Sequence, residues 1–187
     1  MSGVFEQALK LLAESGSVYL VGGAVRDQLL GLPSKDVDAV VSLPLPEVEA
    51  KLRAHGFNPH VIGARKQTVT LFSGGARLDI AEFTDLRKDA LRRDFTINAI
   101  FRNFSTGELY DPLKGLSDLG AKRLRACGNP QERFQEDPVR LLRLIRFAVK
   151  YDLSMDPETW VAAQADIALL GQAAKERVTE ELGRILC

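Results

Sequence analysis

The stretch most informative about the fold covers residues 18–41, VYLVGGAVRDQLLGLPSKDVDAVV. Its first four residues are apolar and end at the pair Gly22-Gly23, which is typical of a short buried strand. Residues 24–30 predict a helix that ends at Gly31, and residues 37–42, rich in valine, predict the next strand. The stretch therefore predicts a strand, a glycine turn, a helix and a second strand in close succession.

Two acidic residues, Asp36 and Asp38, stand one residue apart at the start of the second predicted strand. Alternate side chains of a strand point to the same face, so both carboxylates would point the same way. Carboxylates this close repel unless a cation lies between them, and hard oxygen ligands suit Mg²⁺. The glycine turn adds backbone N–H groups that could hold phosphate. The pattern indicates chemistry on a nucleotide; the alternative is a solvent-facing strand with two acidic residues.

A third acid, Asp79, alternates with apolar residues in Leu78-Asp79-Ile80. Because of this alternation, its side chain could face the same side of a sheet as the aspartate pair. The alternative is an acid on an edge strand, paired with a neighbouring arginine. The sequence leaves both interpretations open.

Around this stretch, the pattern predicts a small α+β fold. Residues 4–12 and 47–55 have helical spacing, and residues 57–62, 68–72 and 77–83 predict three more strands. The turn Ser73-Gly74-Gly75 would join the last two strands as a hairpin. We therefore expect a mixed sheet of about five strands with helices on one side. From Pro138 onward the chain reads as helical, with one apolar stripe made of Leu141, Leu144, Ile145, Ala148 and Val149.

Two further segments carry arginines in patterns that suit phosphate or base recognition. Residues 92–99, RRDFTINA, combine two cations with polar side chains; the alternative is a helix capped by Asp94, with solvated arginines. Residues 136–146, EDPVRLLRLIR, place arginines three apart on one helix face. Asp137 precedes Pro138 and could cap that helix, or it could pair with the polar edge of a base beside an arginine donor.

Composition excludes few classes of protein, but it bears on the binding partners and on the cellular location. The 187 residues carry 25 Lys or Arg and 25 Asp or Glu, yet residues 87–150 have 14 basic against 8 acidic ones. Such segregation suits an enzyme that handles polyanions, or simply a solvated helical surface. Cys127 and Cys187 have no paired or metal-ligand spacing, which fits a reducing cytoplasm. With no membrane-spanning run and no signal-peptide core, we expect a soluble cytoplasmic protein.

Five ordered motifs resemble the class II tRNA nucleotidyltransferases and the related bacterial poly(A) polymerases, in the polymerase-β-like superfamily. Residues 19–40 are close to the family signature LVGGxVRDxLLGxxxxDxD, and residues 91–99 match RRDFTxNA. The other matches are GxxxDPxxGxxDL at residues 107–119, EDxxRxxRxxRF at 136–147 and ERxxEEL at 176–182.

The resemblance implies a nucleotidyltransferase head over residues 1–125 and a helical neck over residues 126–187. Asp36 and Asp38 would hold Mg²⁺, which activates the 3′-hydroxyl of tRNA and supports the incoming triphosphate, with Asp79 as a further catalytic acid. Asp137 and Arg140 would pair with the base edge as a protein template. The residues implied in nucleotide binding are Gly22, Gly23, Arg26, Arg93, Asp137, Arg140, Arg143 and Arg146.

Two departures from the family pattern shape the expected activity. Only residues 84–91 separate the strand ending at Phe83 from the RRDFTINA motif, where CCA-adding members usually carry a longer flexible loop. The chain in this respect resembles CC-adding members, which use CTP. It also ends directly after the neck-type helix, without the usual body and tail domains. The alternatives are a truncated chain, a compact variant, or a chain whose tRNA is held by a second copy or another protein.

The expected function is therefore Mg²⁺-dependent transfer of CMP, two residues in succession, from CTP to the 3′ end of tRNA. Full CCA addition, A addition with ATP and poly(A) polymerisation remain alternatives within the enzyme class. A non-catalytic module that binds RNA or nucleotides, or an inactive fragment, are alternatives outside it. In a fragment, the final helix would expose apolar residues, namely Val178, Leu182 and Leu186.

Overall fold

The computed structural model describes residues 2–62 and 68–186. Its internal contacts divide the chain into two compact units. The first unit comprises Met1–Asp89 and Ile100–Asp111, and the second comprises Ala90–Ala99 and Pro112–Cys187. Residues 90–99 and 112–125 belong to the same unit as the helical part of the chain.

The first unit is built on a seven-stranded mixed sheet with the strand order β3-β4-β5-β2-β1-β6-β7. Strands β2 and β5 run parallel, and the other neighbouring pairs are antiparallel. The elements are α1 (Gly3–Ala13), β1 (Val18–Val21), α2 (Gly23–Leu29), β2 (Val37–Val41), α3 (Leu45–Ala54), β3 (His60–Ile62), β4 (Thr68–Ser73), β5 (Ala76–Glu82), β6 (Phe101–Asn103) and β7 (Leu109–Tyr110).

The α+β class and the five expected strands are confirmed, whereas β6 and β7 were not predicted. These two strands have three and two residues, which is too short to show a period of two. The predicted hairpin is also confirmed: Gly74 and Gly75 join β4 to β5 with φ of 60° and 75°, as a two-residue turn of the favoured hairpin kind requires.

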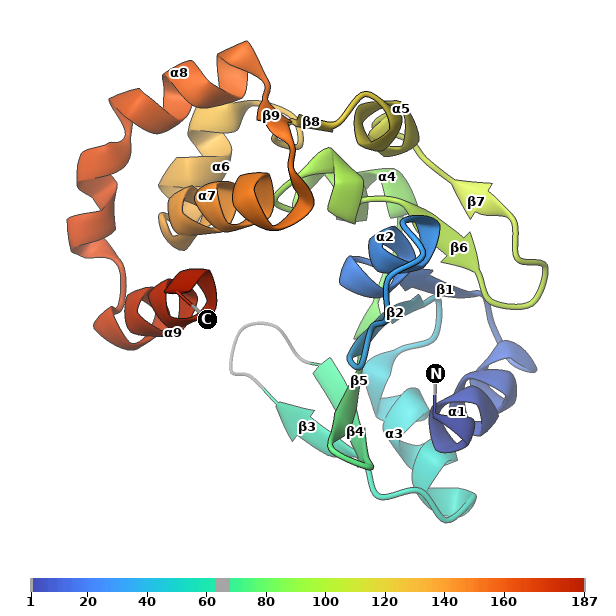
Figure 1. The fold of residues 1–187 in the computed structure, drawn as a ribbon. Coiled ribbons are helices and arrows are strands. Elements are labelled where there is room, and N and C mark those ends of the chain that lie inside the picture. Colours follow the sequence, from blue (N-terminus) through green and yellow to red (C-terminus); the bar gives the residue numbers. More distant parts are fainter. Residues whose placement is uncertain (1, 63–67, 187) are drawn as a thin grey trace. The chain divides into compact units, whose positions relative to one another are not determined.

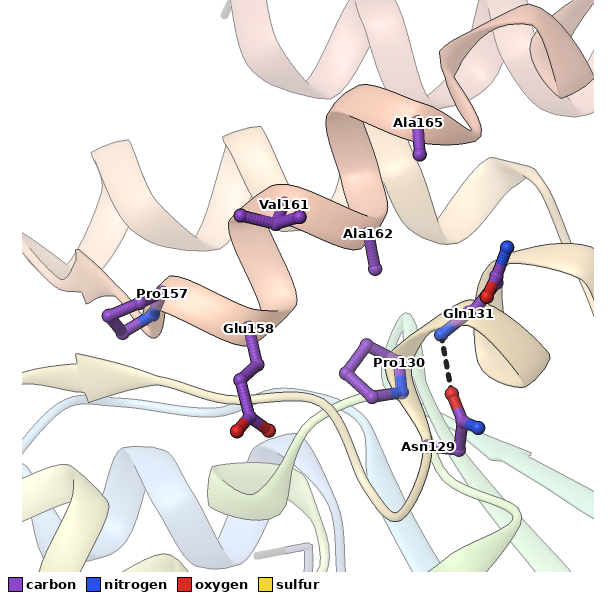
Figure 2. Close-up of a pocket in the computed structure, with 8 residues that line it drawn as sticks. All are labelled: Asn129, Pro130, Gln131, Pro157, Glu158, Val161, Ala162 and Ala165. Carbon is purple, nitrogen blue, oxygen red and sulfur yellow. Dashed lines mark hydrogen bonds between the residues drawn. The ribbon is translucent and has the colours of Figure 1, made fainter.

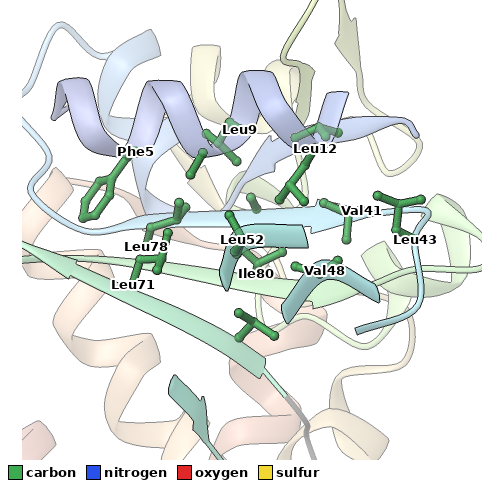
Figure 3. Close-up of a cluster of buried hydrophobic side chains, with 14 of the residues drawn as sticks. Phe5, Leu9, Leu12, Val41, Leu43, Val48, Leu52, Leu71, Leu78 and Ile80 are labelled. Carbon is green, nitrogen blue, oxygen red and sulfur yellow. The ribbon is translucent and has the colours of Figure 1, made fainter. Parts of the chain in front are cut away.

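The core of the first unit lies between the sheet and the helices α1 and α3, which cover one face of the sheet (Figure 3). Residues Phe5, Leu9 and Leu12 of α1 follow helical spacing and are fully buried. From the sheet, Leu78 and Ile80 point into the same cluster. Burying each such side chain contributes about 1.5–3 kcal/mol, so this layer fixes which face of β2 and β5 turns inward.

Helix α3 begins at Leu45, two residues before the predicted start, because both neighbouring prolines belong to its first turn. Pro44 is the N-cap residue, and Pro46 falls within the first helical positions. Proline lacks an N–H but the first turn of a helix needs none there. The two prolines therefore favour the start of this helix at Leu45.

The second unit is mainly helical, as expected from Pro138 onward (Figure 1). Helix α4 (Leu86–Leu91) leads into it from the first unit. Its further elements are η1 (Thr96–Asn98), α5 (Gly115–Gly120), β8 (Arg123–Leu124), α6 (Pro130–Glu136), α7 (Val139–Tyr151), β9 (Ser154–Met155), α8 (Pro157–Ala165), η2 (Ile167–Gln172) and α9 (Lys175–Leu186). The short strands β8 and β9 pair in parallel.

The predicted apolar stripe of α7 is wrong at two positions. Ile145 and Val149 are 37% and 74% exposed, whereas Arg140 is buried. The helix is rotated so that Arg140 faces inward, because its guanidinium finds acceptors there and a buried charge is tolerated only when it is bonded.

A groove of about 450 Å³ lies between the start of α6 and helix α8 (Figure 2). At its edge the side chain of Asn129 accepts a hydrogen bond from the Gln131 N–H at 3.0 Å, and thereby caps α6. No helix in residues 2–62 and 68–186 is long and apolar enough to cross a membrane.

Candidate active site

The parallel pairing of β2 with β5 brings two of the predicted acids side by side. Asp38 stands directly opposite Asp79 in the register of the two strands, so their side chains share one face of the sheet. The residues flanking Asp38, Val37 and Ala39, point into the core on the other face. The structure thus places Asp38 and Asp79 on the face opposite α1 and α3, where Asp38 is exposed and Asp79 half-buried.

Asp36 lies immediately before β2 and is tied to the neighbouring segments by its backbone and side chain. Its Oδ1 accepts a hydrogen bond from the N–H of Arg77 at 3.1 Å, and its carbonyl oxygen accepts one from the Ser34 hydroxyl at 2.9 Å. The residue is exposed. Asp36 is therefore held at the start of β2, close in sequence to Asp38 and open to solvent.

Asp79 already has partners for both of its carboxylate oxygens. The Thr70 hydroxyl donates to Oδ1 at 2.7 Å, and the Arg77 guanidinium pairs with Oδ2 at 2.8 Å. Asp79 thus faces the same side as Asp38 and is also paired with a neighbouring arginine. The alternative is wrong in one respect, because β5 lies between β4 and β2 and is not an edge strand. Within the two described ranges, no group of three or more His, Cys, Asp or Glu side chains is arranged to hold a metal ion.

Gly22 makes room for the carboxylate of Asp38. Its φ of 75° and ψ of −143° lie in a region that is essentially restricted to glycine. A Cβ atom on Gly22 would lie 2.8 Å from Oδ2 of Asp38, closer than contact allows. The first glycine of the pair is therefore required by the position of an acid in the next strand.

Arg26, on α2, is 4% exposed, and its guanidinium is bonded within the first unit. Its Nε and Nη2 donate to Oδ1 of Asp27 at 2.9 and 2.7 Å. A Cβ atom on Gly23 would lie 3.4 Å from Nη2 of Arg26, so the guanidinium also lies against the glycine turn. This arrangement supports the turn from inside the unit.

In the second unit, Asp94 of the RRDFTINA motif is a buried anchor for Arg143. Its Oδ2 pairs with Nη2 of Arg143 and accepts a bond from Nε at 2.8 Å. Burial alone would raise the pKa of the Asp94 carboxyl, but the charge of Arg143 and bonds from Asn98, Arg143 and the Phe95 N–H hold that pKa below its usual value. The alternative, in which Asp94 caps a helix, is wrong, because no side chain caps the helix η1 that follows.

Asp137 is held by Arg177, which α9 supplies. The two guanidinium nitrogens Nη1 and Nη2 donate to Oδ1 and Oδ2 at 2.9 and 2.8 Å, a bidentate pair. The Val139 N–H donates to Oδ1 at 3.3 Å, so Asp137 also satisfies one amide at the start of α7. The hydrogen bond that Arg177 donates to Asp137 is the first cause of the raised pKa of Arg177.

Arg140 is the second residue of α7, and its guanidinium is bonded to two backbone carbonyls and one carboxylate. Nη1 donates to the carbonyl of Arg133 at 2.9 Å and to Glu136 at 3.1 Å, and Nη2 donates to the carbonyl of Arg92 at 2.8 Å. These bonds use three of the five N–H groups that a guanidinium carries. Arg93, the neighbour of Arg92 in the RRDFTINA motif, is half-buried.

A buried acid, Glu181, joins α9 to the other two arginines of α7. It pairs with Arg146 at 2.6 Å and with Arg143 at 3.4 Å, and is itself 5% exposed. The charge of Asp94 raises the pKa of Arg143 although burial opposes it, and Glu181 adds to the rise. Arg143 and Arg146 are thus tied into ion pairs within the second unit.

Sequence reasoning assigned no role to Asp94 as an anchor, to Arg177 or to Glu181. The ERxxEEL motif contains the last two, which lie four residues apart and hence on one side of α9. That spacing was the available signal. The partners, however, lie 35 to 40 residues earlier in the chain, and nothing in a local pattern indicates them.

Comparison with known proteins agrees with this architecture. The poly A polymerase head domain model matches residues 18–85 and 81–125. The CCA-adding enzyme of Streptococcus pyogenes is 35% identical over 209 residues, which cover 100% of this chain and 50% of that enzyme. The chain thus spans about half the length of the curated relatives it matches.

Solved structures agree as well. That of the Bacillus stearothermophilus CCA-adding enzyme in complex with CTP matches with a TM-score of 0.88 at 30% identity, over 100% of this chain and 49% of that one. That of the Thermotoga maritima CCA-adding enzyme complexed with tRNA matches with a TM-score of 0.87 at 32% identity, over 98% of this chain and 46% of that one.

The sheet with its acids on one face and the five motifs define a nucleotidyltransferase head. The chain belongs to the poly(A) polymerase head domain family and, within it, to the class II tRNA nucleotidyltransferases.

Proposed function

We propose that this chain is the catalytic part of an enzyme that transfers CMP from CTP to the 3′ end of tRNA, two residues in succession. The observation that carries the proposal is the pair Asp36 and Asp38 at the start of β2, where both residues are exposed to solvent. A residue other than glycine at position 22 would collide with Asp38, so the local backbone is shaped around this carboxylate. A module that only binds RNA has no use for such an acidic pair.

Mg²⁺ fits these residues, because two exposed carboxylates supply hard oxygen ligands and leave positions for water and phosphate oxygens. When bound, the ion neutralises charge on the phosphates and activates the attacking hydroxyl. Asp36 and Asp38 would hold it. Asp79 would act beside them as the third acid, oriented by Thr70 and Arg77. Gly22 and Gly23 would approach the triphosphate closely, as their lack of side chains allows.

For the base, Asp137 and Arg140 supply the hydrogen-bonding groups that cytosine needs. A carboxylate has about four acceptor positions, so the bonds from Arg177 leave capacity for the amino group of cytosine. Arg140 retains two N–H groups beyond the three bonds described above, which suit the oxygen and ring nitrogen of the base. A wrong base would leave these groups unpaired, which is a strong basis for discrimination.

The other arginines have supporting roles in this proposal. Arg143 and Arg146 would position the template through Asp94 and Glu181, to which they are bonded. Arg93 would contact the sugar or phosphate of the nucleotide. Arg26 would act on the nucleotide through the glycine turn against which it lies.

Restriction to CC addition is supported by the short connection after β5. Helix α4 begins at Leu86, four residues after β5 ends at Glu82, so no extended loop fits there. The alignment with the Streptococcus pyogenes enzyme covers 209 residues against the 187 of this chain, and therefore contains at least 22 positions that this chain lacks. Full CCA addition is the second candidate, because the relatives compared above are CCA-adding enzymes.

The 3′ end of tRNA is the proposed partner of this reaction, and the cytoplasm is its proposed place. A second copy of the chain or another protein would strengthen the grip on tRNA. The exposed apolar residues Leu182 and Leu186 on α9, 42% and 85% exposed, suit such a contact. Cys127 is a buried free thiol, and its burial raises its pKa, so it is inert. Cys187 lies outside the described residues.

A primer-extension assay tests the proposal. The chain is incubated with Mg²⁺ and labelled tRNA that ends at its discriminator base, with CTP, ATP or both. We expect a product that stops at two cytidines with CTP alone and with both nucleotides. A product ending in CCA would contradict the CC restriction. Absence of any product at high protein concentration would contradict transfer by this part of the chain.

The matched controls are Asp36→Asn with Asp38→Asn, and Glu14→Gln on the exposed end of α1. The first pair should abolish the product, while the second should leave it unchanged.

A further inference from the structure

Arg102 on β6 carries a guanidinium nitrogen without a partner. Its Nε is buried and donates no hydrogen bond to any residue that the structure describes. A buried polar group of this kind is destabilising, and more so when it is charged. Arg133 also has an unpartnered Nε, but its other two guanidinium nitrogens are bonded to the Leu91 carbonyl and to Glu136. The Nε of Arg102 has no acceptor among the residues that the structure describes.

A cavity of about 520 Å³ adjoins this arginine in the first unit. Its polar lining comes from Gln28, Ser34 and Asn103, and its apolar lining includes Leu32 and Phe104. Among the described residues that line it, Arg102 is the only charged one. The size suits a small ligand that has one anionic group and an apolar or planar part.

The side chain of Arg102 lies on the other side of the sheet from Asp38, and none of the three acids lines the cavity. Arg102 stands opposite Leu20 in the β1–β6 pair, and Leu20 stands opposite Ala39 in the β1–β2 pair. Residues paired across a sheet share a face, so Arg102 lies on the face of Ala39. Asp38, the neighbour of Ala39, points to the opposite face. The cavity is therefore separate from the candidate metal site.

The polar groups of the cavity are mostly donors. The side-chain oxygen of Asn103 already accepts the N–H groups of Ser105 and Thr106 at 2.9 and 3.0 Å. Its amide nitrogen is the donor that remains. Together with the amide of Gln28 and the guanidinium of Arg102, it makes a set of donors that suits phosphate oxygens, to which arginine binds with planar, bidentate geometry.

We propose that this cavity is a second nucleotide-binding site, in which Arg102 binds the phosphate and the walls formed by Leu32 and Phe104 contact the base or ribose. The apolar walls and the volume favour a nucleotide over inorganic phosphate. The nucleotide is either a free mononucleotide or one residue of an RNA strand, since both present the same groups. The site does not depend on the proposed transfer reaction.

The cavity shares a wall with the segment that carries the acids. Ser34 lines it and donates its hydroxyl to the carbonyl oxygen of Asp36 at 2.9 Å, and Val37 lines it between the two aspartates. A ligand in the cavity therefore lies next to the backbone that presents Asp36. Occupancy of the site should be visible at the amide of Val37.

The test uses amide NMR spectra of the full chain without Mg²⁺ and without primer, titrated with CMP, with inorganic phosphate and with the trinucleotide CCC. We expect millimolar CMP to shift the amides of Gly31, Val37 and Gly107. In Arg102→Gln the affinity should fall at least about tenfold. Arg102→Lys keeps the charge but loses the planar, bidentate guanidinium, and should bind with intermediate affinity. Arg87→Gln, at an exposed arginine of the same unit, should bind as the unchanged chain does.

The proposal is overturned if CMP shifts only Gly22 and Gly23, if it shifts nothing, or if Arg102→Gln and Arg102→Lys both bind as the unchanged chain does. Equal affinity for inorganic phosphate would overturn the assignment to a nucleotide. Tighter binding of CCC than of CMP identifies an RNA strand as the source of the ligand, and the reverse identifies a free nucleotide. Because primer and Mg²⁺ are left out, a negative result leaves the transfer reaction untouched.

Discussion

Arg177 on α9 donates two hydrogen bonds to the carboxylate of Asp137, from Nη1 to Oδ1 at 2.9 Å and from Nη2 to Oδ2 at 2.8 Å. The two residues lie 40 positions apart in the chain. Arg177 is 55% exposed in its side chain and Asp137 25%, so their pairing adds little to stability, about 0–1 kcal/mol. Its main effect is geometric: it fixes the orientation of the carboxylate that we propose reads the base.

The first prediction concerns this pair. Arg177→Ala should lower kcat/KM for CTP about tenfold and reduce the preference for CTP over UTP, because the carboxylate of Asp137 loses its fixed orientation. Its melting temperature should change little. Arg177→Lys should restore the charge without the bidentate geometry and recover only part of the selectivity. Unchanged nucleotide selectivity in Arg177→Ala would refute a positioning role.

A second prediction concerns the two sheet acids. Asp38→Asn should lower the rate of CMP incorporation about 10³-fold, because it removes a ligand of the proposed metal. Asp79→Asn should lower it less, because Asp79 is already neutralised by Arg77. Single-turnover incorporation at several Mg²⁺ concentrations measures both effects. A larger loss in Asp79→Asn would show that Asp79 releases Arg77 during the reaction and acts as the principal acid.

A third prediction follows from the crowding at Gly22. Gly22→Ala should be destabilised by about 1–3 kcal/mol through its backbone conformation and should in addition lose transfer activity, since its Cβ would displace the carboxylate of Asp38. Gly56→Ala is the matched control: its φ is +83°, but a Cβ there meets nothing within 4 Å. We expect the control to be destabilised and still active. Equal activity loss in both variants would speak against the displacement.

The fourth prediction links Asp94 to pH. Because the pKa of Asp94 is lower in the folded chain than in the unfolded one, its contribution to stability is present above the unfolded value of about 3.9 and is lost as pH falls through the folded value. Asp94→Asn should cost about 3–5 kcal/mol at neutral pH, because Arg143 then lacks its buried partner. The variant should also lose this part of the acid dependence.

Urea unfolding of Asp94→Asn between pH 7 and pH 2 measures both effects. Asp152→Asn is its control, because the pKa of Asp152 is likewise lowered, by Lys122, but at an exposed site. There the change in stability should be small at every pH. A stability difference for Asp94→Asn that does not vary with pH would contradict the assignment of this acid dependence to Asp94.

Much of the first unit could be predicted from local patterns. The strand Val18–Val21, the helix that follows the glycine pair and the hairpin at Gly74 and Gly75 were predicted near their observed bounds. Each depends on residues close in sequence: an apolar run, a turn that needs positive φ, a period of two or 3.6. Strands β6 and β7 were missed because two or three residues hold no period.

The face of α7 was predicted only in part, for a different physical reason. The helical spacing of the apolar residues predicts that Val149 faces inward, yet Val149 is 74% exposed and Arg140 is buried. The inward face is decided by acceptors on other segments, such as the carbonyl of Arg92. A charged group that finds such acceptors can be buried where hydrophobicity alone would exclude it.

The sequence by itself determined the types of most elements, the family and the acidic pair, since each is encoded within a few neighbouring residues. The tertiary structure alone decided that Asp79 stands beside Asp38, that Arg177 binds Asp137, and that the Nε of Arg102 has no partner among the residues described. The first two of these relationships join residues 41 and 40 positions apart in the chain. They depend on strand register and helix packing, which are set by burial of the whole core and not by any local period.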